Sequence, residues 1–410
     1  MTIVKHLVFS GGGPIGFVEY GAIKYLTEKN FLDYKNIESI YSISVGGIIG
    51  LIYILNYDWT WMDDFLIKRP WNKLCNISYS SYINILYEKG IINKKVIISA
   101  LEPLFLAKNI PLNITLLEFY NLTKIEFNIF ACSLSNLKQT KFNYITTPNV
   151  ELIDALYISL SVPIVFAPIY VNDDLYLDGG IIVGCPINLC IADKECNNDE
   201  IFCFMNDKMN PIDLSNSFYN KYSENTKANN VISKDANFFE YIFFLIKKLF
   251  VKISNVENDI VTYIKNHINT ALSYNSIDIS YWFQVMSCEK ERCHLVNLGK
   301  IQATNFLNKL EEDAVKEDAV KEDAVKEDAV KEDAVKEDAV KEDAVKETIC
   351  DKQITTLVNQ EAQAEAEATI NISISNQEEE GTGEAEPNTS SLANQEEERE
   401  GEGESSISTF

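Results

Sequence analysis

The chain has 410 residues and a formal net charge of −25 at pH 7. Residues 301–410 carry −21, so residues 1–300, which contain all four tryptophans, carry only −4. The acidity therefore belongs to a C-terminal segment, and no basic stripe indicates binding to nucleic acid. The N-terminal apolar stretch is broken by glycines too early for a signal peptide, and no uncharged apolar run reaches the roughly 18 residues of a membrane span.

The nine cysteines are an odd number without the short spacings of a metal site. This pattern predicts reduced thiols and a cytoplasmic protein. Cys185, Cys190 and Cys196 lie close together in the sequence, but no histidine accompanies them. We therefore predict thiols here, with no metal site and no cofactor.

Apolar runs and helical spacings alternate along the first half of the chain. Residues 3–9 predict a buried strand, and residues 17–28 a helix with one apolar face. A strand over 37–43 leads into an almost wholly apolar helix over 46–55. Farther along we expect a strand over 127–134, a helix over 152–160 and a strand over 175–177. Strands that alternate with helices predict an α/β fold, with a mostly parallel central sheet covered by helices on both faces.

Beyond residue 192 the alternation fades, and we expect residues 193–300 to form a mixed or helical extension packed on the first domain. Residues 313–347 are seven tandem copies of Asp-Ala-Val-Lys-Glu. A five-residue step turns a helix by about 140°, so the valines spiral around it and form no core-facing stripe. Each Glu precedes a Lys by four residues, which favours helical ion pairs. We predict a partly helical, solvated spacer over 311–350 and a disordered acidic tail over 351–410.

The loop between the first strand and helix consists of Gly11, Gly12, Gly13, Pro14, Ile15 and Gly16. Successive glycines let backbone N–H groups converge at a helix N-terminus, which can hold a phosphate or an oxyanion. Pro14 has no N–H, so Gly12 and Gly13 are the expected donors. The spacing of Gly11, Gly13 and Gly16 also fits a dinucleotide site. The second strand, however, ends without the acidic residue that would hold a ribose.

Two further segments carry chemically useful side chains at strand ends. In Ser42-Ile43-Ser44-Val45-Gly46 small residues stand two positions on either side of Ser44, as a nucleophile elbow requires. Taken alone, Ser44 could equally cap the following helix. In Leu177-Asp178-Gly179-Gly180 an aspartate ends a strand before two glycines, which alone would indicate a simple turn.

Together and in this order, these segments resemble the patatin-like phospholipase family. That family combines a glycine-rich loop, a Gly-x-Ser-x-Gly elbow and a later Asp-Gly-Gly or Asp-Gly-Ala. Residues 159–168 also resemble its Ser-x-x-x-Pro-x-x-Phe-x-Pro stretch. The resemblance covers residues 5–192 and implies a three-layer patatin-like domain followed by the acidic tail, which is disordered or a single helix.

The resemblance also implies a serine ester hydrolase acting on lipids, of the phospholipase A or lysophospholipase type. Ser44 would be the nucleophile and Asp178 its base, with Ser42 and Gly46 shaping the elbow. Gly11, Gly12, Gly13 and Gly16 would form the oxyanion hole, and Gly179 and Gly180 complete the Asp-Gly-Gly motif. The partner would be a lipid ester reached by peripheral membrane contact; the particular lipid and the oligomeric state stay open.

Two departures from the family pattern keep other functions open. Ser42 stands where the family has glycine, which adds a side chain to a tight turn. Ile15 stands where many members have Arg or Lys, which weakens the expectation of an anionic head group. The alternatives are a catalytically silent lipid-binding relative and a scaffold whose repeat and acidic tail bind partners.

The histidine content favours a direct Ser–Asp pair. The chain has three histidines, His6, His267 and His294. His6 is at the wrong end of its predicted strand, and the other two follow the catalytic half. A dyad is therefore simpler than a Ser-His-Asp triad. Burial would raise the pKa of Asp178 and make it a better base.

The segment 59–71 is rich in large apolar side chains: Trp59, Trp61, Phe65, Leu66 and Trp71. We favour core packing for them. Lining of an acyl channel and contact with a membrane are the alternatives.

Overall fold

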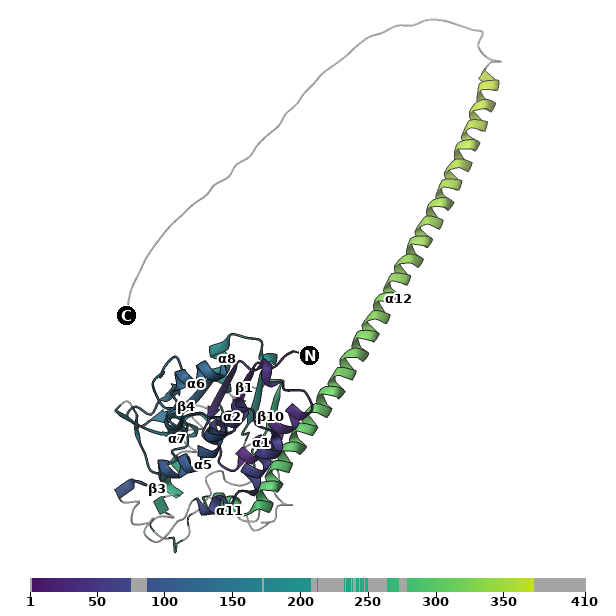
Figure 1. The fold of residues 1–410 in the computed structure, drawn as a ribbon. Helices are drawn as coiled ribbons and strands as arrows, with labels where there is room; N and C mark the ends of the chain where they lie inside the picture. The colour runs from purple at the N-terminus through teal and green to yellow at the C-terminus, as the bar shows by residue number, and fades with distance from the viewer. Residues whose placement is uncertain are drawn as a thin grey trace, which may run out of the picture. The chain divides into compact units, whose positions relative to one another are not determined.

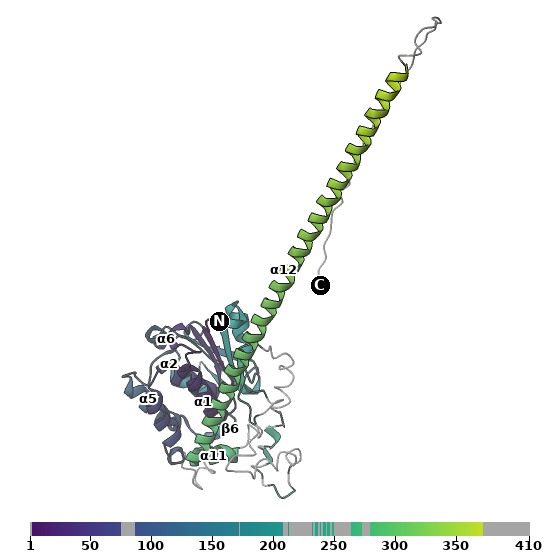
Figure 2. The same ribbon diagram turned by 90° about the vertical axis from the view of Figure 1, so that its right-hand side faces the viewer.

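The computed structural model describes residues 2–74, 87–171, 173–207, 264–272 and 279–371, together with Ile212 and scattered positions between 232 and 249. The chain divides into two compact units, Met1–Asp318 and Ala319–Phe410. Figure 1 and Figure 2 show the ribbon from two directions. Among the described residues, no helix combines the length and apolar character needed to cross a bilayer.

The first unit is built on an α/β sheet of eight strands, as the sequence predicted. In spatial order, seven of them are β10 (His267–Asn269), β9 (Ile201–Met205), β1 (His6–Phe9), β2 (Ser39–Ile43), β4 (Glu126–Ser133), β8 (Asp174–Asp178) and β7 (Tyr170–Val171). The run from β10 to β4 is parallel, whereas β8 pairs antiparallel with β4 and β7 antiparallel with β8. The eighth strand, β5 (Gln139–Phe142), pairs antiparallel with β4. A separate two-stranded sheet joins β3 (Gly90–Ile92) to β6 (Ile164–Phe166).

Helices cover both faces of the central sheet (Figure 1). The α-helices are α1 (Ile15–Glu28), α2 (Val45–Leu55), α3 (Trp59–Asp63), α5 (Lys94–Ala107), α6 (Leu116–Thr123), α7 (Leu152–Ser159), α8 (Ile187–Lys194), α11 (Ile279–Ser287) and α12 (Glu289–Asn371). The shorter helical turns are η1 (Tyr34–Asn36), the π-helical η2 (Asp64–Lys68), η3 (Trp71–Lys73), η4 (Gly179–Ile181) and η5 (Asn198–Glu200).

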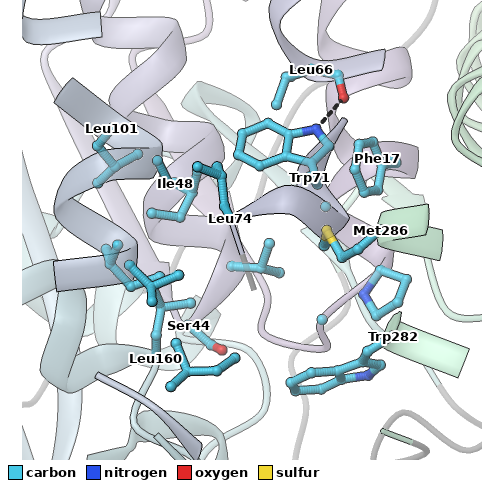
Figure 3. A pocket seen from close by; sticks show the side chains of 18 of the residues that line it. Phe17, Ser44, Ile48, Leu66, Trp71, Leu74, Leu101, Leu160, Trp282 and Met286 are labelled. Atoms are coloured by element: carbon cyan, nitrogen blue, oxygen red, sulfur yellow. Dashed lines mark hydrogen bonds between the residues drawn. The ribbon is translucent and has the colours of Figure 1, made fainter. Parts of the chain in front are cut away.

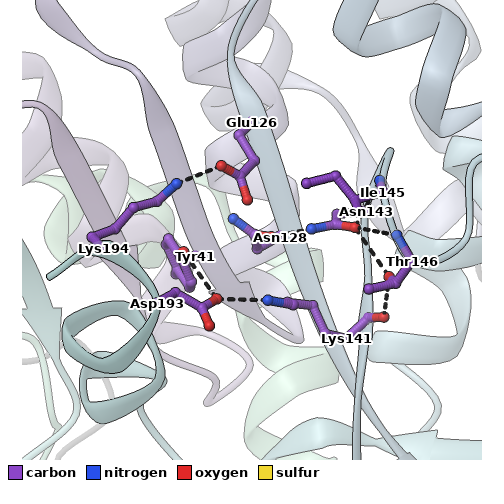
Figure 4. A network of polar contacts seen from close by, with 9 residues as sticks. All are labelled: Tyr41, Glu126, Asn128, Lys141, Asn143, Ile145, Thr146, Asp193 and Lys194. Atoms are coloured by element: carbon purple, nitrogen blue, oxygen red, sulfur yellow. Dashed lines mark hydrogen bonds and ion pairs between the residues drawn. The ribbon is translucent and has the colours of Figure 1, made fainter.

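Successive side chains of each strand point to opposite faces of the sheet, so each face carries its own core. On β1, Leu7 and Phe9 enter the large core under α1, α2 and α7, while Val8 enters a smaller core under α8. A polar network at α8 supports this second layer (Figure 4). Asp193 of α8 accepts hydrogen bonds from the Tyr41 hydroxyl at 3.1 Å and from Lys141 Nζ at 2.6 Å. These contacts fix α8 against β2 and β5.

Residues beyond 192 complete the sheet itself, whereas the sequence predicted an extension packed on a finished domain. β9 lies beside β1, and the ring of Phe204 stacks on that of Phe9 with centroids 4.7 Å apart. The first turns of α12 also enter the main core, through Leu295 and Phe306. β9 and the helices α11 and α12 are far apart in the sequence, which hid their common packing from sequence analysis.

The repeat forms part of the long helix α12. Val340 and Val345 are 68% and 57% exposed, and Lys346 Nζ lies 4.0 Å from Glu342 Oε2, one helical turn away. These side chains of the repeat are thus exposed to solvent along the helix. The helix extends to Asn371, so residues 351–371, for which disorder and a single helix were the two predicted alternatives, are helical. They contain helix-forming residues and no Gly or Pro. Residues 372–410 lie outside the described part of the chain.

Candidate active site

Ser44 occupies a sharp turn between β2 and α2. Its backbone has φ 54° and ψ −127°, a region that a residue with a side chain enters only when its surroundings hold it there. The Ser44 N–H donates to Ser159 Oγ at 2.8 Å, and the Ser159 hydroxyl donates to the Phe130 carbonyl at 2.7 Å. Ser159, the last residue of α7, therefore ties the turn to β4.

The residues two positions before and after Ser44 are tightly enclosed. A Cβ on Gly46 would lie 2.7 Å from both Phe9 Cβ and the Ser10 carbonyl oxygen, so no larger residue fits. Ser42 is fully buried, and its hydroxyl donates to the Asn128 carbonyl at 3.3 Å. The side chain that departs from the family pattern is thus accommodated with a hydrogen-bond partner on the next strand.

The strand register brings Asp178 to the same level as Ser44. Ile43 at the end of β2 aligns with Phe130 of β4, and the next residue, Ala131, aligns with Asp178 at the end of β8. Because β8 is antiparallel and pairs only with the last residues of β4, its carboxyl end reaches the edge where the parallel strands end. The two predicted side chains therefore meet across β4.

Asp178 and Ser44 are each only 5% exposed. Desolvation raises the pKa of Asp178 from 3.8 to about 6, and hydrogen bonds with the Ser44 side chain and the Gly180 amide oppose part of that rise. The Gly180 N–H donates to Asp178 Oδ1 at 2.7 Å, and a Cβ on Gly180 would lie 3.0 Å from the same oxygen. At pH 7 this aspartate is mostly ionised, yet it is a stronger base than an ordinary carboxylate.

The glycine loop lies directly beside the elbow. A Cβ on Gly11 would lie 3.2 Å from Ser44 Cβ. The Gly11 N–H donates to the Gly184 carbonyl and the Gly16 N–H to the Gly13 carbonyl, both at 3.1 Å. The amides of these two residues of the predicted oxyanion hole are thus engaged in shaping the loop, whereas the expected donors are those of Gly12 and Gly13. Gly13, with φ 61°, lines the same cavity as Ser44.

Asn206, which sequence analysis missed, holds this loop from β9. Its side-chain amide donates to the Gly11 carbonyl at 2.7 Å, and its backbone N–H donates to Ser10 Oγ at 3.1 Å. A trans peptide is planar, so fixing the Gly11 carbonyl also fixes the direction of the Gly12 N–H. The sequence could have indicated Asn206 by its position, because it is a polar residue directly after a short apolar strand and lies at the edge of the sheet that carries the site.

An apolar cavity of about 210 Å³ opens beside Ser44 (Figure 3). Apart from Ser44, its lining side chains are apolar. They come from the glycine loop, α1, α2, η2, η3, β3, α5, β6 and α11, and from Leu74 and Leu160. In Figure 3, Leu66 and Trp71 lie away from Ser44, on the opposite side of the cavity. Such a cavity suits a flexible apolar chain whose polar end remains at the serine.

The aromatic segment 59–71 has mixed roles. Phe65, Leu66 and Trp71 line the cavity, Trp59 packs against the core, and Trp61 is 38% exposed. Core packing and lining of the cavity therefore both apply.

Residues 7–191 match the family model of patatin-like phospholipases. These residues form a patatin-like phospholipase domain. An uncharacterized protein of Acanthamoeba polyphaga mimivirus is 29% identical over 188 residues, which are 45% of this chain and 61% of that protein. A probable lipid hydrolase of Invertebrate iridescent virus 6 is 30% identical over 189 residues, 46% of this chain and 63% of that protein. The chain thus spans less than two thirds of these relatives.

The solved structures that this chain matches include VipD from Legionella pneumophila. It has a TM-score of 0.38 at 17% identity, covering 75% of this chain and 67% of VipD. The complex of SpcU with ExoU from Pseudomonas aeruginosa gives a TM-score of 0.24 at 20% identity, covering 39% of each chain.

None of the three histidines lines the cavity of the patatin-like domain. His6 Nδ1 is hydrogen-bonded with Ser39 Oγ at 2.8 Å. Both residues begin their strands, at the edge of the sheet opposite to that of Ser44. His267 Nδ1 lies 2.6 Å from the Ile264 carbonyl oxygen, and His294 belongs to α12. The Ser44 side chain is instead hydrogen-bonded with the carboxyl group of Asp178.

The patatin-like domain does not enclose the cavity alone. Trp282, Phe283 and Met286 of α11 form one wall, and α11 lies outside residues 7–191. A Cβ on Gly13 would lie 2.5 Å from Cε2 of the Trp282 indole, so this ring covers the glycine loop closely. Sequence analysis gave no indication of this wall, because contacts between distant segments leave no local pattern.

Proposed function

We propose that the protein hydrolyses the carboxylic ester of a lipid through an acyl-enzyme, with Ser44 as nucleophile and Asp178 as base. One observation carries the proposal: a buried aspartate with a pKa of about 6 is hydrogen-bonded with a serine that faces an apolar cavity. The membership of residues 7–191 in the patatin-like family and the relative named a probable lipid hydrolase support it.

In the first half of the proposed reaction, the Asp178 carboxylate accepts the proton of the Ser44 hydroxyl while Oγ bonds to the ester carbonyl carbon. The carbonyl oxygen becomes an oxyanion. We propose that the Gly13 N–H is a principal hydrogen-bond donor to it, because Gly13 lines the cavity. The Gly12 N–H stays a predicted donor. The N-terminus of α2, which begins directly after Ser44, adds positive potential. The bond to the leaving alcohol then breaks, and the alcohol takes the proton from Asp178.

In the second half, a water molecule attacks the acyl carbon and gives a proton to Asp178. The bond from the acyl carbon to Ser44 Oγ breaks, and Asp178 returns the proton to that oxygen. A carboxylic acid leaves and the dyad is restored. The acyl chain would occupy the apolar cavity throughout, which holds the reacting carbon at Ser44.

We also propose that the protein is cytoplasmic and meets its substrate by peripheral contact with a membrane. The eight described cysteines are free thiols, as expected in a reducing compartment. Lipid esters reside in membranes, so a protein that draws one acyl chain into a cavity must touch the surface. Cosedimentation with phosphatidylcholine vesicles tests this contact.

A serine-reactive fluorophosphonate probe tests the proposed nucleophile. We expect the folded wild-type protein to be labelled at Ser44 and Ser44→Ala to be unlabelled. Ser39→Ala is the matched control, because Ser39 lies on β2, the strand that leads to Ser44, and its hydroxyl is bonded to His6. It should be labelled like wild type.

Two results would contradict the proposal. Equal labelling of Ser44→Ala would remove Ser44 from the reaction. A folded wild-type protein that takes no label, hydrolyses no ester and still binds a fatty acid would favour the silent lipid-binding alternative.

A further inference from the structure

Arg292, near the start of α12, is a buried cation held by backbone carbonyls. Its side chain is 2% exposed, and among the described residues the structure records no ion pair for it. The guanidinium donates instead to four carbonyl oxygens: Nε to Ile67 at 2.8 Å, Nη1 to Val285 and Met286 at 2.8 Å each, and Nη2 to Arg69 at 3.1 Å.

These four carbonyls explain how a charge can remain buried here. Ile67 and Arg69 lie at the C-terminal end of η2, and Val285 and Met286 lie in the last turn of α11. The last carbonyls of a helix lack partners within the helix and carry partial negative charge. A planar guanidinium satisfies several of them at once, in fixed directions.

Arg292 joins η2 to α11, which are far apart in the sequence and form walls of the same cavity. Phe65 and Leu66 of η2 and Met286 of α11 line it. Both ribbon views show α11 beside the first turns of α12, from which Arg292 comes (Figure 1, Figure 2). Trp71 of η3 also lines the cavity, and α11 packs on η3. The guanidinium thus fixes how far these walls stand apart.

We propose that Arg292 is a positioning residue that sets the width of the acyl cavity and thereby selects long acyl chains. This inference rests on the proposed hydrolysis of lipid esters. Short acyl groups need only the space next to Ser44, whereas long ones must extend toward the walls that Arg292 holds. Selection for chain length is therefore built from a segment outside the patatin-like domain.

The first test compares p-nitrophenyl butanoate with p-nitrophenyl hexadecanoate as substrates of wild type, Arg292→Lys and Arg292→Met. In Arg292→Met we expect kcat/KM for the long ester to fall about tenfold or more, because methylene groups of the long acyl chain lose contacts with the cavity walls. We expect kcat/KM for the short ester to change by less than about threefold. Arg292→Lys keeps the charge but not the planar fork, so its long-ester loss should be intermediate.

Lys194→Met is the matched control. Lys194 is a partly buried cation bonded to Glu126 in the network of Figure 4, and neither residue lines the cavity. The ratio of kcat/KM for the long ester to kcat/KM for the short ester should be the same in Lys194→Met as in wild type. Equal losses on both esters in Arg292→Lys, or an unchanged preference in Arg292→Met, would overturn the proposal.

A binding measurement separates this inference from the proposed catalysis. In the Ser44→Ala background, Arg292→Met should weaken binding of a fluorescent long-chain fatty acid about tenfold, whether or not the protein is a hydrolase. If circular dichroism shows that Arg292→Met is unfolded, Met286→Trp decides: it fills the α11 wall and should shift the preference toward the short ester. Unchanged fatty acid binding in a folded Arg292→Met, or an unchanged preference in Met286→Trp, would refute the role of these walls.

Discussion

Replacing Asp178 with asparagine tests the chemistry of the site and its electrostatics in one variant. Asparagine keeps the size and hydrogen-bonding shape of the side chain and removes its ability to accept a proton. Loss of a general base lowers rates by about 10²–10⁴-fold, so we expect kcat for lipid esters to fall by that amount. In wild type, kcat/KM should rise with pH through a midpoint near the Asp178 pKa of about 6.

The same pKa predicts a change in stability. The folded protein raises the pKa of Asp178 from 3.8 to about 6, chiefly by desolvation. At 1.36 kcal/mol per pKa unit, the ionised carboxylate destabilises the folded state by about 3 kcal/mol. Below the unfolded pKa both states are protonated and this cost is absent. As pH rises from the unfolded pKa of 3.8 to the folded pKa of about 6, only the unfolded chain releases the Asp178 proton. Wild type therefore loses stability relative to Asp178→Asn.

Urea unfolding from about pH 4 to pH 7 measures this effect. The free energy of unfolding of Asp178→Asn minus that of wild type should rise by about 2.4 kcal/mol over this range, because the unfolded carboxyl is already partly ionised at pH 4. Asp174→Asn is the control on the same strand. Hydrogen bonds from Ser133 and Ser135 lower the pKa of Asp174, so its difference should change little between pH 4 and pH 7 and should move in the opposite direction only below about pH 4. A difference for Asp178→Asn that does not depend on pH, or an acid limb of activity near pH 4, would refute the reasoning.

Two further substitutions test how the site is held. Ser159→Ala leaves the Ser44 N–H buried without its acceptor, so we expect a stability loss of about 1–3 kcal/mol in thermal or urea unfolding and a roughly tenfold lower kcat. Unchanged kcat would show that Ser159 does not hold the elbow. Asn206→Ala releases the Gly11 carbonyl, and kcat should fall about tenfold with little change in KM. A rise in KM alone would assign Asn206 to substrate binding.

The sequence by itself determined the parts of the fold that depend on local pattern. The two-residue and helical periods predicted β1, β2, β4, β8, α1, α2 and α7 close to their observed bounds. The need for small residues around Ser44 predicted a turn in which Gly46 has no room for a Cβ. The pentad step predicted a helix with exposed valines.

Only the tertiary structure decided which distant residues surround that local chemistry. Ser159 and Asn206 act on the backbone of Ser44 and Gly11 through single hydrogen bonds, which no spacing encodes. The antiparallel pairing of β8 with the end of β4 brings Asp178 to Ser44. Likewise, Arg292 joins η2 to α11 through backbone carbonyls of residues more than two hundred positions apart. Periodicity reports which face of an element is apolar, whereas the choice of partner depends on packing between elements, and that is fixed only when the chain has folded.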